Sequence, residues 1–136
     1  MSWDIYVQDI PASVKSVSEM PDDFQPRPLG RRADIIARIR EIVPSADFTS
    51  PSWGQIDGPD FSIEVSMGNL EQVESFTFHV RGGDLAAVVV ADILRHLGYR
   101  ALDPSSPSGI FEPDGDPAAG LRRWRDYRDS IAGKTI

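Results

Sequence analysis

Three short segments alternate apolar and polar residues with a period of two, and this pattern constrains the fold more than any other feature of the chain. They cover residues 3–8, 61–66 and 76–81. Successive side chains of a strand point to opposite faces of a sheet, so each segment predicts a strand with one buried and one solvated face. Residues 67–74 join the second and third segments, which therefore predict a β-hairpin with a long loop.

Two further stretches repeat apolar residues at helical spacing. Residues 31–43 predict an amphipathic helix that Pro44 ends, because proline disfavours helical geometry in the preceding residue. Residues 84–97 predict a second helix, with Asp84 as its N-cap and Gly98 as its left-handed terminator.

Weaker signals complete the order of elements. Turn residues leave room for a short strand at 53–56, and residues 99–103 predict a strand with a return strand at 110–111. The order is then strand, helix, strand, strand, helix, strand. It predicts an α+β fold, a ferredoxin-like βαββαβ sandwich with an antiparallel sheet and two helices on one face, plus an extra C-terminal helix.

Residues 9–30 form a connection longer than is usual in a compact domain, rich in proline, serine and acids. Loops of this length are either functional or disordered. We predict an ordered wrap over the surface, because the segment carries spaced apolar anchors. They are Val14, Val17, Met20, Phe24 and Leu29.

The C-terminal segment differs in charge from the rest of the chain. Residues 1–116 carry nine basic and nineteen acidic side chains, whereas residues 117–136 carry five and two. Asp116 and Pro117 predict the start of a third helix that ends near residue 129. We expect a single domain at 1–116 and a basic helix and tail at 117–136 that docks on this domain or on a second copy. Trp124 should be at least half buried there, and residues 133–136 should fray.

The amino-acid composition excludes several kinds of chemistry. The chain of 136 residues has no cysteine and two histidines, so disulfides, thiolate zinc sites, iron-sulfur clusters and His-rich metal sites are ruled out. The sequence also lacks the serine-hydrolase elbow and the zinc-protease helix motif. We expect no metal, no cofactor and no catalytic residues.

The net charge of −7 and a pI near 4.7 restrict the partners. This charge repels nucleic-acid phosphates and anionic lipid surfaces. Tyr6 is also the one aromatic residue on the polar face, where RNA-recognition modules stack bases on several. There is no secretory signal, and the longest apolar run, residues 85–91, is far too short for a membrane span. We expect a cytoplasmic protein that binds neither nucleic acid nor membranes.

The polar residues of the alternating segments should share the open face of the sheet. Glu64 and His79 should lie within reach of each other as a cross-strand pair, with Arg81 two positions along. A carboxylate, an imidazole and a guanidinium form a usable acid/base and anion-binding set, but a solvated polar face explains the same pattern. The expected face comprises Asp4, Tyr6, Gln8, Ser62, Glu64, Ser66, Thr77, His79 and Arg81.

Two other motifs have structural explanations that outweigh functional ones. Residues 81–84, Arg-Gly-Gly-Asp, resemble a phosphate-binding turn, but they lack the lysine and the glycine spacing of a P-loop and fit a strand-to-helix turn. An acidic cluster lacks the pattern of a calcium loop and is better explained as a soluble loop. It comprises Asp103, Glu112, Asp114 and Asp116.

Together these observations predict a non-catalytic, acidic protein-binding domain that covers a basic surface of its partner, as a bacterial immunity-type or regulatory protein would. The alternative is a small-ligand-binding protein or enzyme that uses Glu64, His79 and Arg81 in a concave pocket. Homodimerisation through the sheet face or the C-terminal helix also stays open. The predicted binding residues are Asp4, Tyr6, Trp53, Glu64, His79 and Arg81.

Overall fold

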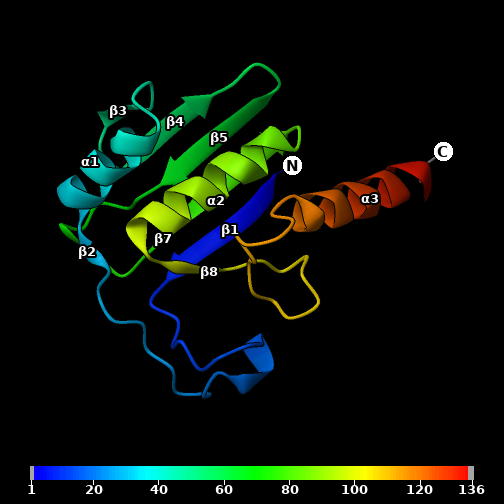
Figure 1. Ribbon diagram of the computed structural model, residues 1–136, viewed down its shortest axis with the longest axis horizontal. Coiled ribbons are helices and arrows are strands. Elements are labelled where there is room, and N and C mark those ends of the chain that lie inside the picture. Colours follow the sequence, from blue (N-terminus) through cyan, green and yellow to red (C-terminus); the bar gives the residue numbers. More distant parts are fainter. Residues whose placement is uncertain (1, 135–136) are drawn as a thin grey trace.

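The computed structural model describes residues 2–134, with side chains for residues 2–131. Its main sheet has six strands, all antiparallel to their neighbours, in the order β3-β4-β5-β7-β1-β8, and a small second sheet pairs β2 with β6 (Figure 1). The strands are β1 Trp3–Gln8, β2 Gly30–Arg31, β3 Asp47–Ser50, β4 Trp53–Asp57, β5 Phe61–Ser66, β6 Gln72–Val73, β7 Ser75–Gly82 and β8 Arg100–Leu102.

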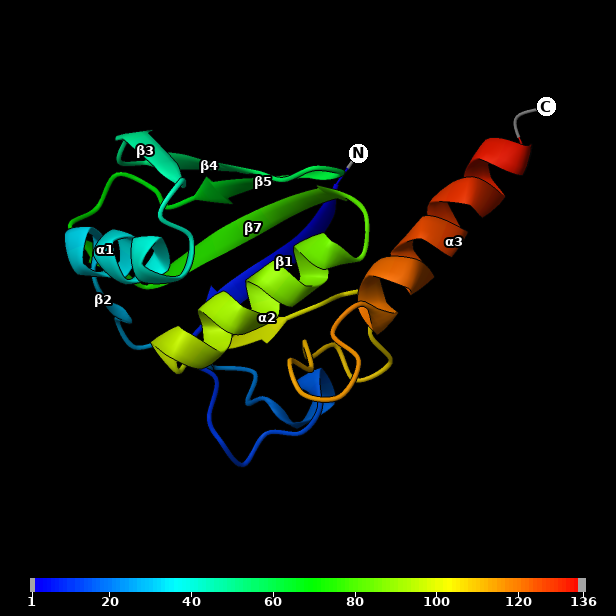
Figure 2. The same ribbon diagram turned by 45° about the horizontal axis from the view of Figure 1, so that its top comes forward.

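Three α-helices and one short 3-10 helix occur in the described residues. Both views place α1 and α2 against one face of the main sheet, while α3 extends away from the sheet (Figures 1 and 2). Among residues 2–134, no α-helix packs on the opposite face of the sheet (Figure 2). The helices are η1 Val17–Glu19, α1 Arg32–Ile42, α2 Leu85–Leu97 and α3 Ala119–Lys134.

The predicted α+β class is confirmed, but the ferredoxin-like topology is not, because the strand order differs. The sheet has six strands instead of four, since β3 and β4 form a hairpin that extends it beyond β5. The sequence predicts part of β4 but not β3. In β3 only Phe48 is apolar among four residues, so the strand carries no period-two signal.

The alternating segments fold as strands whose apolar residues face the helices. In β5 and β7 the residues Ile63, Val65, Phe78 and Val80 are fully buried, and their polar neighbours are not. Burying a large apolar side chain contributes about 1.5–3 kcal/mol, so this layer between sheet and helices supplies most of the stability. Leu121 of α3 belongs to the same core.

The β5-β7 hairpin has the predicted register, with Glu64 opposite His79 and Val65 opposite Phe78. Its connection is long because it contains β6, which pairs with β2 in the second sheet. The backbone N–H of Leu29 also donates to the carbonyl of Val73 at 2.7 Å. The end of the loop at 9–30 is thereby tied to the hairpin.

Residues 81–84 form the predicted strand-to-helix turn between β7 and α2. Gly82 has φ +108°, and a Cβ there would lie 2.3 Å from the carbonyl oxygen of Asp60, so only glycine fits. The prediction that Asp84 caps α2 through its side chain is wrong. Its carboxylate instead forms ion pairs with the guanidinium groups of Arg122 and Arg125 of α3.

Helix α3 begins two residues after Pro117 and is longer than the sequence predicts. Trp124 packs partly buried against the core, as expected. Residues 133 and 134 are helical, so the predicted fraying is wrong for them. Residues 135 and 136 lie outside the described part of the chain.

The base of α3 is held by a buried carboxylate. Asp103 is 1% exposed and accepts hydrogen bonds from Trp3 Nε1 at 2.9 Å, from the Ser105 backbone N–H at 2.9 Å and from the Ser105 hydroxyl at 2.6 Å. The Ser105 hydroxyl also lies 2.9 Å from the carbonyl oxygen of Gly120. The first turn of α3 is therefore attached next to the first residue of β1.

Residues of the connection at 9–30 pack into a second, small core. Val14 and Ile10 pack there with Ile110, but Val17 is exposed and does not act as the predicted anchor. Arg100 donates to the backbone carbonyls of Pro11 and Val14. The predicted return strand is reduced to a single bridge between Leu102 and Ile110.

Candidate functional site

The open face of the main sheet gathers all six residues that the sequence predicts for binding. Strands β4, β5, β7 and β1 are neighbours, and alternate residues of each point away from the helices. In register, His79 lies opposite Asp4 on one side and Glu64 on the other. The residues are Asp4, Tyr6, Trp53, Glu64, His79 and Arg81.

His79 is at the centre of this group. Its Nδ1 lies 2.8 Å from Oδ1 of Asp4, a distance at which the ring N–H donates to the carboxylate. The two side chains are 25% and 31% exposed, so each keeps only part of its contact with water. This hydrogen bond holds the imidazole in one orientation on the sheet.

The indole of Trp53 stacks on the imidazole of His79. The ring centroids are 5.8 Å apart and the planes differ by 20°. Trp53 is on β4, and its partner in register on β5 is Ser66, a small residue over which the indole reaches β7. Trp53 is 44% exposed, so a large aromatic side chain is both held in place and accessible.

Glu64 does not pair with His79, although the two are direct neighbours in register. Oε1 of Glu64 lies 3.1 Å from Nη1 of Arg81, which donates to it. The predicted trio therefore separates into two pairs, one between Asp4 and His79 and one between Glu64 and Arg81. The sequence could not decide this, because both carboxylates are adjacent to the same imidazole.

Tyr6 lies farther along β1, 37% exposed, beside a hollow of about 590 Å³. Burial raises the pKa of its hydroxyl, and the negative charge of Asp4 raises it further. Val17 and Leu102 form part of the wall of the hollow, with Pro104 and Pro107. The hollow is mainly apolar and extends the face toward its β8 edge.

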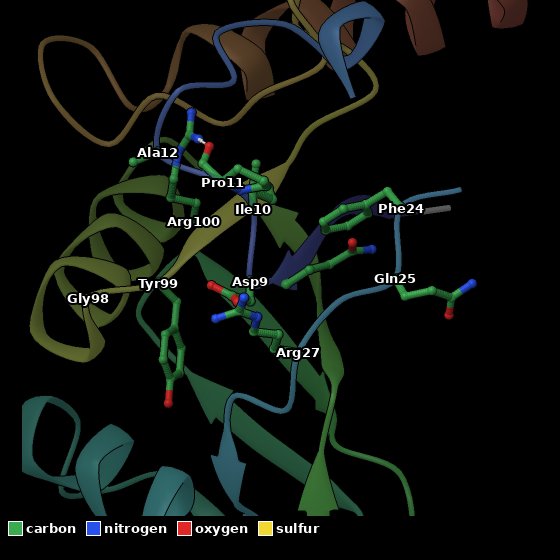
Figure 3. Close-up of a pocket in the computed structure, with 11 residues that line it drawn as sticks. Asp9, Ile10, Pro11, Ala12, Phe24, Gln25, Arg27, Gly98, Tyr99 and Arg100 are labelled. Atoms are coloured by element: carbon green, nitrogen blue, oxygen red, sulfur yellow. Dashed lines mark hydrogen bonds between the residues drawn. The ribbon is translucent and has the colours of Figure 1, made fainter. Parts of the chain in front are cut away.

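A second hollow, of about 620 Å³, lies where β1 ends and β8 begins (Figure 3). Asp9, Arg27 and Tyr99 are among the residues that line it. Sequence reasoning missed this hollow because its walls come from three separate segments of the chain. The unusual length of the loop at 9–30 was the only signal that could have indicated it.

The open face presents paired charged groups and partly exposed aromatic side chains. Of the hollows described above, neither is lined by Glu64, His79 or Arg81. The charged groups of these three residues pair on the sheet surface, His79 with Asp4 and Glu64 with Arg81, instead of facing a shared cavity. An enzyme or a small-molecule site requires more enclosure than a sheet surface offers.

Two residues of the predicted acidic cluster, Asp103 and Asp116, form hydrogen bonds within the chain. Asp103 is buried and hydrogen-bonded, and Asp116 accepts from Arg122 at 2.8 and 2.9 Å. The Arg122 guanidinium holds the pKa of the Asp116 carboxyl below its ordinary value, mainly through these hydrogen bonds. Within residues 2–131 no three histidine or carboxylate side chains come close enough together to hold a metal ion.

Comparisons of the chain with protein families, with curated proteins and with solved structures found no match. Among the described residues, no helix has both the length and the hydrophobicity that crossing a membrane requires.

Proposed function

We propose that the open face of the sheet is a protein-binding surface and that the protein acts by covering a partner, without catalysis. The observation that carries this proposal is Trp53, an exposed indole held against His79. Tryptophan and tyrosine are enriched among the residues that dominate binding energy, because they contribute a large rigid area at low entropic cost. Tyr6 provides a second such side chain on the same face.

The charge of the face favours a basic partner. On its four central strands, β4, β5, β7 and β1, Asp4, Asp57 and Glu64 provide three carboxylates, and Arg81 supplies one guanidinium that Glu64 already binds. The excess of acidic side chains in residues 1–116 adds a field of the same sign around it. Complementary fields raise the association rate and select partners. A small regulatory or immunity-type protein that blocks a basic site on its target would work in this way.

The paired side chains also support binding over catalysis. An interface loses affinity when flexible side chains must be ordered on contact. Here the bond between Asp4 and His79 and the bond between Glu64 and Arg81 order four of them in advance. The alternative function, a small-ligand or catalytic site at Glu64, His79 and Arg81, lacks the enclosure that such a site needs.

A photo-crosslinking amino acid at position 53 tests the proposal in cells of the native host. The matched control carries the same amino acid at Leu85, an exposed apolar position on α2. We expect a discrete protein adduct from position 53 and none from position 85. The adduct should weaken as salt increases, because the attraction is electrostatic. Equal labelling from both positions, or none from position 53, would contradict the proposal.

A further inference from the structure

Trp53 and Tyr6 belong to one row of residues that crosses the strands of the open face. The register pairs Trp53 with Ser66 of β5, and Ser66 with Thr77 of β7. Thr77 pairs in turn with Tyr6 of β1. Residues directly opposite each other in an antiparallel sheet point to the same face, and the ladder hydrogen bonds run perpendicular to the strands. The row therefore has an aromatic residue at each end and two small residues between them.

The row continues past Tyr6 into the hollow at the β8 edge of the face. Tyr6 pairs with Leu102 of β8, and both residues line this hollow of about 590 Å³. The described residues around it include no charged side chain. Val17, on the far wall, is 44% exposed, and covering such apolar surface is favourable. The hollow therefore fits an uncharged, apolar group.

Hydrogen bonds and close packing hold the walls of this hollow in place. The backbone N–H of Val17 donates to the carbonyl of Ser108 at 2.8 Å, and the Ser16 hydroxyl donates to the same carbonyl at 3.3 Å. Val17 also packs on Gly109, where a Cβ would lie 2.3 Å from its Cγ2 atom. The hollow is thus formed before a partner arrives, which reduces the entropic cost of binding.

The hollow is shallow and open to solvent, so a side chain of a longer segment fits it better than a free small molecule. Small-molecule sites enclose most of the surface of their ligand. A side chain needs less enclosure, because the other contacts of its segment keep it at a high local concentration. The exposed indole of Trp53, in the same row, provides such a contact.

A second row, next to the first, carries acidic side chains across the face. Three of its residues are carboxylates, and one of these, Glu64, is bound to the guanidinium of Arg81. The row keeps a negative charge after this pair is counted, so a segment that crosses the strands beside it is complementary when it is basic. From β1 to β3 the row comprises Asp4, His79, Glu64, Gln55 and Asp47.

The distance across the face sets the length of such a segment. Neighbouring strands lie about 4.8 Å apart, so the four steps from β4 to β8 span about 19 Å. An extended chain rises about 3.3 Å per residue and covers this span in about six residues. It also turns every second side chain toward the sheet, as contact at both ends of the row requires.

We infer that the open face binds an extended basic segment of the partner protein, laid across the strands, with an apolar side chain in the hollow and a lysine or arginine over Trp53. A cation is attracted to the face of an exposed indole, and Glu64 on the next strand adds a carboxylate. About six residues separate the two anchoring side chains of the segment. This inference rests on the proposed function, because it names the partner of the same face.

Selection from a random library of twelve-residue peptides displayed on phage, with the full chain as bait, tests the inference. We expect the enriched peptides to be basic and to carry an aliphatic or aromatic residue about six positions from a lysine or arginine. Binding of a synthetic copy of the most enriched peptide is then measured by fluorescence polarisation. Its affinity should fall as salt increases, because part of the attraction is electrostatic.

Variants of the two anchoring positions locate the peptide on the face. Val17→Asp puts a charge into the hollow, and Trp53→Ser removes the indole; each should weaken peptide binding by at least about tenfold. The matched control, Leu85→Asp, makes the same change of charge at an exposed apolar position on α2 and should bind like the unchanged protein. Circular dichroism verifies that each variant is folded. Enrichment of no peptide, or a folded Val17→Asp variant that binds as tightly as the control, would overturn the inference.

Photo-crosslinking from position 17 in the native host separates this inference from the proposed function. We expect positions 17 and 53 to label the same protein, at sites about six residues apart on one segment. An adduct from position 53 without one from position 17, or labels on separate segments, would overturn the inference and leave the proposed function standing. The absence of adducts from both positions would overturn both.

Discussion

The two faces of the main sheet are built by the same strands but stabilised by different interactions. On the covered face, Phe78 and Val65 pack in a layer where almost any apolar side chain of suitable volume would contribute. On the open face, Asp4 binds His79 and Glu64 binds Arg81 in specific pairs. Exposed pairs contribute about 0–1 kcal/mol each, less than one buried aromatic side chain. Most of the stability therefore comes from the covered face, and the side chains of the open face can form specific pairs without being needed for folding.

We expect the largest difference between the two faces in the effect of substitutions at two adjacent residues of β7. Phe78→Ala should lower the free energy of unfolding by about 3–5 kcal/mol, because it leaves a cavity in the core. Thr77→Ala, on the open face, should change it by less than about 1 kcal/mol. Urea denaturation of both variants measures the difference. Similar losses of unfolding free energy at both positions would mean that the open face contributes to stability as much as the covered face does.

A buried polar residue at the end of β8 sharpens the comparison. Asp103→Ala should cost about 1–3 kcal/mol, because the Ser105 N–H loses its acceptor and Trp3 Nε1 keeps only the Ser105 hydroxyl, in a buried place. Asp114→Ala, which removes a carboxylate that is 92% exposed, is the matched control and should stay within about 0.5 kcal/mol. Thermal melting checks both. If both substitutions lowered stability by the same small amount, the buried hydrogen bonds of Asp103 would not contribute to the stability of the fold.

The open face should respond weakly to removal of its central pair. A double-mutant cycle with Asp4→Ala and His79→Ala should give a coupling energy of about 0.2–1 kcal/mol. Each partly exposed side chain gives up only some of its hydration. Chemical denaturation of the four proteins provides the cycle. A coupling energy well above this range would mean that the open face also contributes substantially to the stability of the fold.

The smallest effect concerns pH. Arg122 lowers the pKa of Asp116, so the folded state favours its ionised form. This contribution is present above the ordinary pKa of an aspartate, about 4, and is lost as pH falls through the lower folded-state value. Asp116→Asn should therefore be slightly less stable than the unchanged protein at neutral pH and equal to it in strong acid. Asp22→Asn controls for the loss of one charge in an exposed loop, and a gap that persists in acid would contradict the assignment.

Much of the candidate site could be predicted from local pattern. Alternation alone puts Asp4, Tyr6, Glu64, His79 and Arg81 on one face, because a strand turns every second side chain the same way. The selection of pairs could not be predicted, since it depends on which neighbouring strand brings the nearer charge. The contact of Trp53 with His79 depends on β4 joining the sheet beside β5.

The sequence by itself determined the features that depend on a few neighbouring residues. The periods of two and of 3.6 predict strands and helices, and Gly98 ends α2 in the left-handed conformation as its type predicts. The acidic body and basic C-terminal segment follow from counting. These features need no distant partner, so they can be predicted from one stretch of chain.

Only the tertiary structure decided the features that join distant stretches. The hydrogen bond between Trp3 and Asp103 spans 100 residues, and the contact of Arg122 with Asp84 spans 38. Each charged side chain has several chemically suitable partners in the sequence, and the packing of the core selects the one that lies within reach. For the same reason β3 joins the sheet despite a weak strand pattern, because β4 offers it an unpaired edge. Local pattern determines which secondary structure each segment can form, and packing between segments determines which residues it contacts.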